Sequence, residues 1–278
     1  MKKLVIAFFF LIWAGLIGSC NYDTFTSSDK EFTGYRYYYV NGMQTDFTEA
    51  IADKKELYRA MVEYKDSHPD EHIFDDLTED DVRLAFNYDE TSIDDIFEAF
   101  LQKNFDTFQI FFVFPLELPM PNFIEDPYEE MVDDYILKTV SNILKSPSDD
   151  LRKHIRYYEK DLKEGKKIVL IGHSQGNFYA NEAYDYLQSN DVGVVAVATP
   201  ADRVGKDIIN APYTTFYQDE VINTVRFFYP DLWSLPPNMS ADTCDSSTCH
   251  NFVRDYLSPD NASRTKIVRD IIRVAKDL

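Results

Sequence analysis

One five-residue motif constrains the fold of this chain more than any other feature. Residues 172–176 read Gly-His-Ser-Gln-Gly, and they lie between an apolar run at 167–171 and a segment of helical character at 174–188. Glycine on both sides permits a tight, strained turn that raises the Ser174 hydroxyl above a sheet, where bulkier flanking residues would collide with a neighbouring strand or helix. The motif therefore predicts a strand–turn–helix corner with a reactive serine. The alternative is a glycine-bounded turn without catalysis.

The remaining segments extend this pattern over the chain. Apolar and β-branched runs predict strands, and apolar residues at helical spacing predict helices. Strands that alternate with helices predict the α/β class, with a mostly parallel central sheet flanked by helices. The expected strands are 35–40, 82–88, 167–171, 192–199 and 212–217, and the expected helices are 47–64, 91–105, 128–145, 149–164, 174–188, 251–257 and 265–277.

The N-terminus has the features of an export signal. Two lysines precede an uncharged apolar run, 4–17, and the small residues Gly18 and Ser19 precede Cys20. This pattern is typical of a secretory signal peptide, and its end is similar to a bacterial lipobox, whose cysteine is lipidated and becomes the new N-terminus. The alternative is a plain signal peptide cut elsewhere. We expect a signal peptide at 1–19, a lipidated polar tether at 20–33, a single domain at 34–278, and a membrane-anchored lipoprotein of the bacterial cell envelope.

Composition argues for a folded chain and against a nucleic-acid-binding protein. The chain has 278 residues, of which 45% are apolar, and this is enough to build a core. It carries 28 basic and 48 acidic residues, a formal charge of −20. Loss of the two leader lysines changes this to −22, since 26 basic residues then face 48 acidic ones. Such a surface repels phosphate backbones, so we expect no nucleic-acid partner.

A reactive serine needs a base and an acid. In folds with this corner, the order along the chain is serine, acid, histidine. His250 is the one histidine that follows Ser174, and we expect it to be the base rather than a surface or capping residue. His173 adjoins the serine, and on a sharp turn adjacent side chains diverge. Asp219 comes after the predicted strand 212–217 and is the favoured acid, because the acid of such a site follows a strand near the end of the sheet, with Asp202 and Glu220 as alternatives.

Two backbone positions are candidates for an oxyanion hole. The N–H of Gln175 lies at the start of the helix after the serine, where it faces any oxyanion formed there. The second N–H is expected from Gly42 or Met43, in the loop after the strand 35–40, because glycine lets the backbone approach a substrate closely. The alternative is an ordinary Asn-Gly turn.

Two cysteines lie directly before the candidate base. Cys244 and Cys249 enclose four residues, and in an exported protein they are expected to form a disulfide that holds the loop of His250 in place. A metal pair is the alternative, but no second cysteine or histidine pair has ligand spacing. We therefore expect no metal and no cofactor.

These residues together resemble the α/β-hydrolase superfamily, specifically its lipase- and esterase-like serine hydrolases. The matching pieces are residues 39–42, the motif 172–176, Asp219 and His250. The resemblance implies hydrolysis of a carboxylic ester in a small molecule or lipid: Ser174 attacks, His250 carries the proton, Asp219 orients the imidazole, and an acyl-enzyme forms. The rival interpretations are a catalytically inactive lipid-anchored binding protein on this fold, and an acyltransferase with the same triad.

A helical and proline-rich insertion is expected to form a cap-like element. The segment 105–127 combines six phenylalanines with four prolines, which exclude a long helix. It is either a cap that lines an acyl pocket or a core strand followed by a surface loop. The candidate lining residues are Phe111, Phe112, Phe114 and Leu116, and residues 233–237 are a second candidate flap.

Overall fold

The computed structural model describes residues 31–42, 45–87, 148–207, 209–228 and 234–278. Several predictions lie outside these ranges. They concern the signal peptide, the lipidation at Cys20, Met43, the helices at 91–105 and 128–145, the cap-like segment 105–127, and Trp233 of the second flap.

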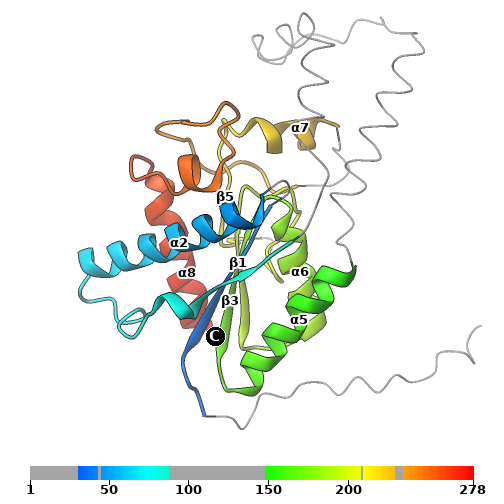
Figure 1. The fold of residues 1–278 in the computed structure, drawn as a ribbon. Coiled ribbons are helices and arrows are strands. Elements are labelled where there is room, and N and C mark those ends of the chain that lie inside the picture. The colour runs from blue at the N-terminus through cyan, green and yellow to red at the C-terminus, as the bar shows by residue number, and fades with distance from the viewer. Residues whose placement is uncertain (1–30, 43–44, 88–147, 208, 229–233) are drawn as a thin grey trace, which may run out of the picture.

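A five-stranded, wholly parallel sheet forms the centre of the molecule (Figure 1). Its order in space is β2-β1-β3-β4-β5, and Tyr39 of β1 lies opposite Leu84 of β2 and Ile171 of β3. The predicted α/β class with a parallel sheet is thereby confirmed. The strands are β1 (Tyr35–Val40), β2 (Val82–Ala85), β3 (Lys167–His173), β4 (Val192–Val197) and β5 (Tyr213–Thr214).

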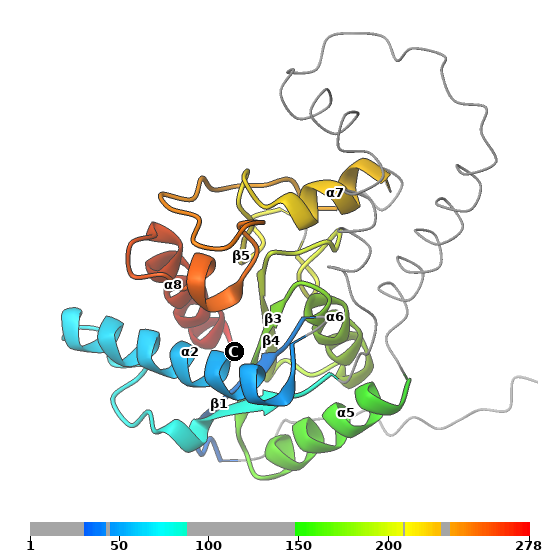
Figure 2. The same ribbon diagram turned by 45° about the horizontal axis from the view of Figure 1, so that its top comes forward.

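Helices cover both faces of this sheet (Figure 2). One face carries α2 (Phe47–Ser67), α8 (Ala262–Asp277) and the π-helical turn η3 (Phe252–Tyr256), and the other carries α5 (Ser148–Lys163) and α6 (Gly176–Leu187). Among the described residues, none of the helices combines the length and the apolar character of a membrane span. A 3-10 turn, η1 (Glu79–Asp81), leads into β2.

The sheet buries side chains on both faces, as expected for parallel strands. Successive residues of β1 alternate between two cores. Tyr37 and Tyr39 pack with α2 and α8, whereas Tyr38 and Val40 pack with α5 and α6. All four are at most 1% exposed, so the aromatic run that predicted a strand also supplies both cores.

The end of the chain's last strand differs from its prediction. The expected strand 212–217 forms ladder pairs only as β5, and beyond Thr214 the backbone bonds elsewhere. The N–H of Thr215 donates to Asn238 Oδ1 (3.0 Å) and that of Phe216 to the Tyr256 hydroxyl (3.0 Å). An unpredicted helix, α7 (Glu220–Phe228), follows. The backbone therefore leaves the edge of the sheet after Thr214 and continues toward the carboxyl ends of the strands.

The strand order marks where a ligand would bind. From β1 the chain passes to β2 on one side, and from β3 it passes to β4 and β5 on the other. In open parallel sheets, ligands bind outside the carboxyl ends of the strands at such a reversal. Gly42 follows β1 and Ser174 follows β3, so the predicted corner lies at this position.

Candidate active site

The turn at Ser174 has the strained geometry that the motif predicts. Ser174 has φ +53°, a left-handed value that is uncommon for a residue with a side chain. It joins the end of β3 to the start of α6. The serine is recessed rather than protruding, since it is only 5% exposed. Gly42 packs against it, so closely that a Cβ on this glycine would lie 2.8 Å from the serine Cβ.

The two motif glycines are required by their neighbours. A Cβ on Gly172 would lie 2.8 Å from the Cα of Asn177, and one on Gly176 would collide with the carbonyl oxygen of Val40. Both contacts would be closer than van der Waals packing allows, so any larger residue would push α6 away from the sheet. The steric explanation given for the motif holds at both positions.

Ser174, His250 and Asp219 form a continuous hydrogen-bonded chain. The serine Oγ lies 3.0 Å from His250 Nε2, and His250 Nδ1 lies 2.8 Å from Asp219 Oδ2 and 3.0 Å from Oδ1. A carboxylate only accepts, so Nδ1 carries the proton and Nε2 accepts from the serine. This is the arrangement in which an imidazole can remove a serine proton.

Asp219 is fixed by more than the histidine. It is fully buried, and it accepts hydrogen bonds from the N–H of Ile222 (2.9 Å) and from the hydroxyl of Tyr256 (2.7 Å). The first bond makes Asp219 the N-terminal cap of α7, because an aspartate commonly accepts from the N–H three residues ahead. The acid and its helix therefore form one unit.

Neither alternative acid takes this place. Asp202 is exposed beyond the end of β4. Glu220 begins α7, and its N–H donates to the carbonyl of Thr248 (3.0 Å). Burial and the charge of Asp219 raise the pKa of Glu220. Asp219 is the carboxylate that meets the imidazole.

His173 contacts the loop of the base, although the sequence argument set it aside. Its Nε2 lies 3.0 Å from the carbonyl oxygen of His250, so this nitrogen donates. Burial, and then the nearby His250, lower the pKa of His173 well below its ordinary value. His173 is therefore neutral and adds no positive charge beside the base. Only its adjacency to Ser174 signals it in the sequence.

A cross-linked loop presents His250. The structure joins Cys244 and Cys249 in a disulfide, as expected. The buried Asp255 carboxylate accepts from the N–H groups of Asp245 (2.8 Å) and Ser246 (2.9 Å), from the Ser246 hydroxyl, and from the N–H of Asn251 (2.8 Å). The loop is thus held at both sides of the base.

The candidate oxyanion loop is held by a pair of asparagines. Asn41 Oδ1 accepts from the N–H of Asn87 (2.8 Å), and Asn87 Nδ2 donates to the carbonyl of Asn41 (2.7 Å). Asn41 Nδ2 also donates to the carbonyl of Gly42 (2.9 Å). Gln175 occupies the position before α6 without a side-chain capping bond, and the helix N–H groups there lack intrahelical acceptors. Gln175 follows Ser174 in the chain, and Gly42 packs against the serine from the loop after β1.

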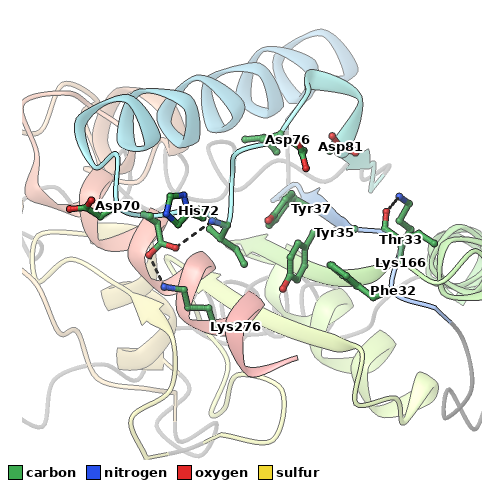
Figure 3. A pocket seen from close by; sticks show the side chains of 14 residues that line it. Phe32, Thr33, Tyr35, Tyr37, Asp70, His72, Asp76, Asp81, Lys166 and Lys276 are labelled. Carbon is green, nitrogen blue, oxygen red and sulfur yellow. Dashed lines mark hydrogen bonds and ion pairs between the residues drawn. The ribbon is translucent and has the colours of Figure 1, made fainter.

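A separate hollow lies at the opposite end of the sheet (Figure 3). It has a volume of about 630 Å³, and its aromatic wall includes Tyr35, the first residue of β1. Two of its carboxylates are already paired: Glu71 with Lys276 (2.7 Å), and Asp81 with Arg36. Its position at the amino ends of the strands excludes it from the Ser174 chemistry.

Comparison with known protein families, with curated proteins and with solved structures finds no match. Within the described ranges, no group of three or more histidine, cysteine or acidic side chains is arranged to hold a metal.

Proposed function

We propose that this protein is a serine hydrolase of the α/β-hydrolase type that cleaves carboxylic esters through an acyl-enzyme on Ser174. The observation that carries the proposal is the chain from Ser174 Oγ to His250 Nε2 (3.0 Å) and from His250 Nδ1 to Asp219 (2.8 Å). The parallel sheet order and the strained serine turn support the fold assignment.

The first half of the reaction transfers the acyl group. Ser174 Oγ attacks the ester carbonyl carbon while its proton passes to His250 Nε2, and the buried Asp219 stabilises the resulting imidazolium. The negative charge on the carbonyl oxygen is met by the N–H of Gln175 and by an N–H of the loop at Gly42. Collapse of this intermediate breaks the ester C–O bond, and the departing alcohol takes the proton from His250.

The second half releases the acid. A water molecule gives its proton to His250 Nε2 as its oxygen attacks the acyl carbon. The second intermediate collapses, the serine oxygen regains the proton, and a carboxylic acid leaves. One ester and one water thus give one alcohol and one acid, and the enzyme is unchanged.

The geometry favours the enzyme over the binding-protein alternative. In a catalytically inactive protein on this fold, no reaction requires the base and the nucleophile to lie within hydrogen-bond distance. Here the acid, base and serine are all in contact, and separate bonds from Ile222 and Tyr256 hold the acid. Such preorganisation is costly unless it serves a reaction.

Ester turnover tests the proposal. A series of p-nitrophenyl esters of increasing chain length is incubated with the protein and with Ser174→Ala, and release of nitrophenolate is followed. We expect hydrolysis of at least one ester by the wild type and a loss of roughly four to six orders of magnitude in kcat for the variant. Equal rates for the two folded proteins would exclude Ser174 as the nucleophile.

We further propose that the enzyme is exported and held at the bacterial envelope by lipid on Cys20. The polar tether 20–33 then connects the membrane to β1, which begins at Tyr35. Dual or multiple acyl chains give stable anchoring. Fractionation of cells that express wild type or Cys20→Ser tests this: the wild type is expected in the membrane pellet and the variant outside it, and co-sedimentation of both would refute lipid anchoring.

A further inference from the structure

Tyr256 lies behind the acid of the proposed triad. Its hydroxyl donates to Asp219 Oδ2 (2.7 Å) and accepts from the N–H of Phe216 (3.0 Å). Its ring stacks on Phe216 with centroids 4.1 Å apart and an interplanar angle of 9°. The residue is fully buried. Its ring also lies edge-on to that of His173, with centroids 6.2 Å apart, whereas its hydroxyl meets the triad at Asp219.

We propose that Tyr256 is a positioning residue that fixes Asp219 and weakens its attraction for the proton on His250. The inference rests on the proposed function, because it assigns a residue that holds the acid of the same triad. The two bonds of its hydroxyl tie the acid to the backbone directly after β5. The turn η3 thereby sets where the acid lies relative to the imidazole.

The hydroxyl acts on charge as well as on position. Both Asp219 oxygens lie within 3.0 Å of His250 Nδ1, and Oδ2 is shared with Tyr256. A donated hydrogen bond stabilises the carboxylate and so reduces its pull on the neighbouring N–H. Without the Tyr256 hydroxyl, the Asp219 carboxylate attracts the imidazolium more strongly. His250 should then hold its proton to higher pH.

The phenol remains a donor throughout the pH range of interest. Burial, and then the charge of Asp219, raise the pKa of Tyr256 well above its ordinary value. The tyrosine therefore does not ionise while a histidine titrates. Its effect on the triad is constant with pH, which makes the pH profile a clean readout.

Other titratable groups surround this pair, and all remain in place when the Tyr256 hydroxyl is removed. His173 of β3 has its ring 5.0 Å from that of His250 and is neutral. Glu220 of α7 adjoins Asp219, and Asp255 of η3 holds the loop before the base. A shift on changing Tyr256 alone is therefore attributable to its bond with Asp219.

The experiment compares three changes in the mature, disulfide-bonded protein. Tyr256→Phe removes the donor but keeps the ring. Replacement of Tyr256 by 3-fluorotyrosine keeps both bonds and makes the phenol a stronger donor. Tyr38→Phe is the matched control, since it removes a buried tyrosine–aspartate bond of the same 2.7 Å length, to Asp161, from the opposite face of the sheet.

Two readouts separate a positioning role from a structural one. The titration of the His250 ring is followed by NMR, and kcat and KM are measured against pH. For Tyr256→Phe we expect the midpoint to move up by roughly half a pH unit, kcat to fall about tenfold and KM to stay constant, because the residue does not touch substrate. The fluorinated protein should shift to lower pH, and Tyr38→Phe should match the wild type.

Each outcome decides the inference. If Tyr256→Phe folds and its histidine titrates as in the wild type, the inference is wrong. If that variant does not fold, the fluorinated protein decides, and the absence of a downward shift overturns the inference. If the midpoints move as expected but the wild type hydrolyses no ester, the link between Tyr256 and His250 stands and the proposed function fails.

Discussion

At the scale of single residues, the proposed site depends on one hydrogen-bonded chain of three side chains. His250 can accept from Ser174 only if its other nitrogen holds a proton, and the buried Asp219 ensures that it does. The neutral His173 beside it carries no charge that would oppose the imidazolium. The strongest test at this scale changes the acid without changing its shape.

Asp219→Asn is expected to lower kcat about 10⁴-fold, because the amide favours the wrong imidazole tautomer. The matched control is Asp202→Asn, which alters the exposed acid after β4 and should retain wild-type activity. Both are measured by ester hydrolysis after a circular-dichroism check of folding. A similar loss in the two variants, or none in the first, would contradict the assigned acid.

Sequence reasoning proposed the three side chains that the structure brings into contact, but it missed those that hold them. Ser174, His250 and Asp219 could be proposed from spacing and chain order, since those follow from chemistry. Tyr256 and Asp255 belong to a short helical turn whose sequence carries no motif. Their contacts depend on how η3 packs against the end of β5, and local patterns do not encode that.

At the scale of elements, the strand–turn–helix unit depends on a clamp within α6. Asn177 Nδ2 donates to the carbonyl oxygens of Ser174 (2.8 Å) and Val197 (2.9 Å), so it joins the serine turn to the end of β4. Four residues later, the buried Asn181 makes a similar pair of bonds, donating to the Arg203 carbonyl and accepting from the Gly205 N–H. Helix α6 thus carries one asparagine that holds the serine turn, Asn177, and one that holds the loop after β4, Asn181.

These two asparagines give a prediction with an internal control. Asn177→Ala and Asn181→Ala each remove two hydrogen bonds of a buried side chain and should each lower the free energy of unfolding by about 2 kcal/mol. Only Asn177→Ala should also lower kcat, since it alone releases the Ser174 carbonyl. Urea titration and ester hydrolysis measure the two effects. Equal loss of activity in both variants would argue against the clamp.

Element prediction succeeded where periodicity was strong and failed at the sheet edge. The central strands and the helices on both faces follow directly from apolar runs and helical spacing. The predicted strand 82–88 ends at Ala85, and 212–217 forms only two residues of ladder. Helix α7 was missed although Asp219 is its cap, because that residue had been interpreted only as a catalytic acid.

At the scale of the whole molecule, a buried acid away from the proposed site, Asp53, is expected to make the stability of the fold depend on pH. The Tyr39 hydroxyl donates to Asp53 Oδ2 (2.8 Å), which links β1 to α2. Burial, and then the charge of Glu49, raise the pKa of Asp53 to about 7. In the unfolded chain the same group releases its proton near its ordinary value of 3.8.

The sign of the effect follows from these two values. Between pH 3.8 and about 7 the folded state binds a proton that the unfolded state has lost, so Asp53 destabilises the fold as pH rises. Asp53→Asn removes this dependence. The free energy of unfolding of Asp53→Asn, relative to that of the wild type, should rise by roughly 3 kcal/mol from pH 5 to pH 8. Urea titration at each pH measures this difference. A constant difference would show that Asp53 ionises normally.

Covalent labelling shows whether Ser174 is an activated nucleophile. The mature protein and Ser174→Ala are treated with a fluorophosphonate, and intact mass and peptide mapping locate the adduct. We predict one adduct on Ser174 in the wild type and none in the variant. A folded wild type without an adduct, or with the adduct on another residue, would contradict the account.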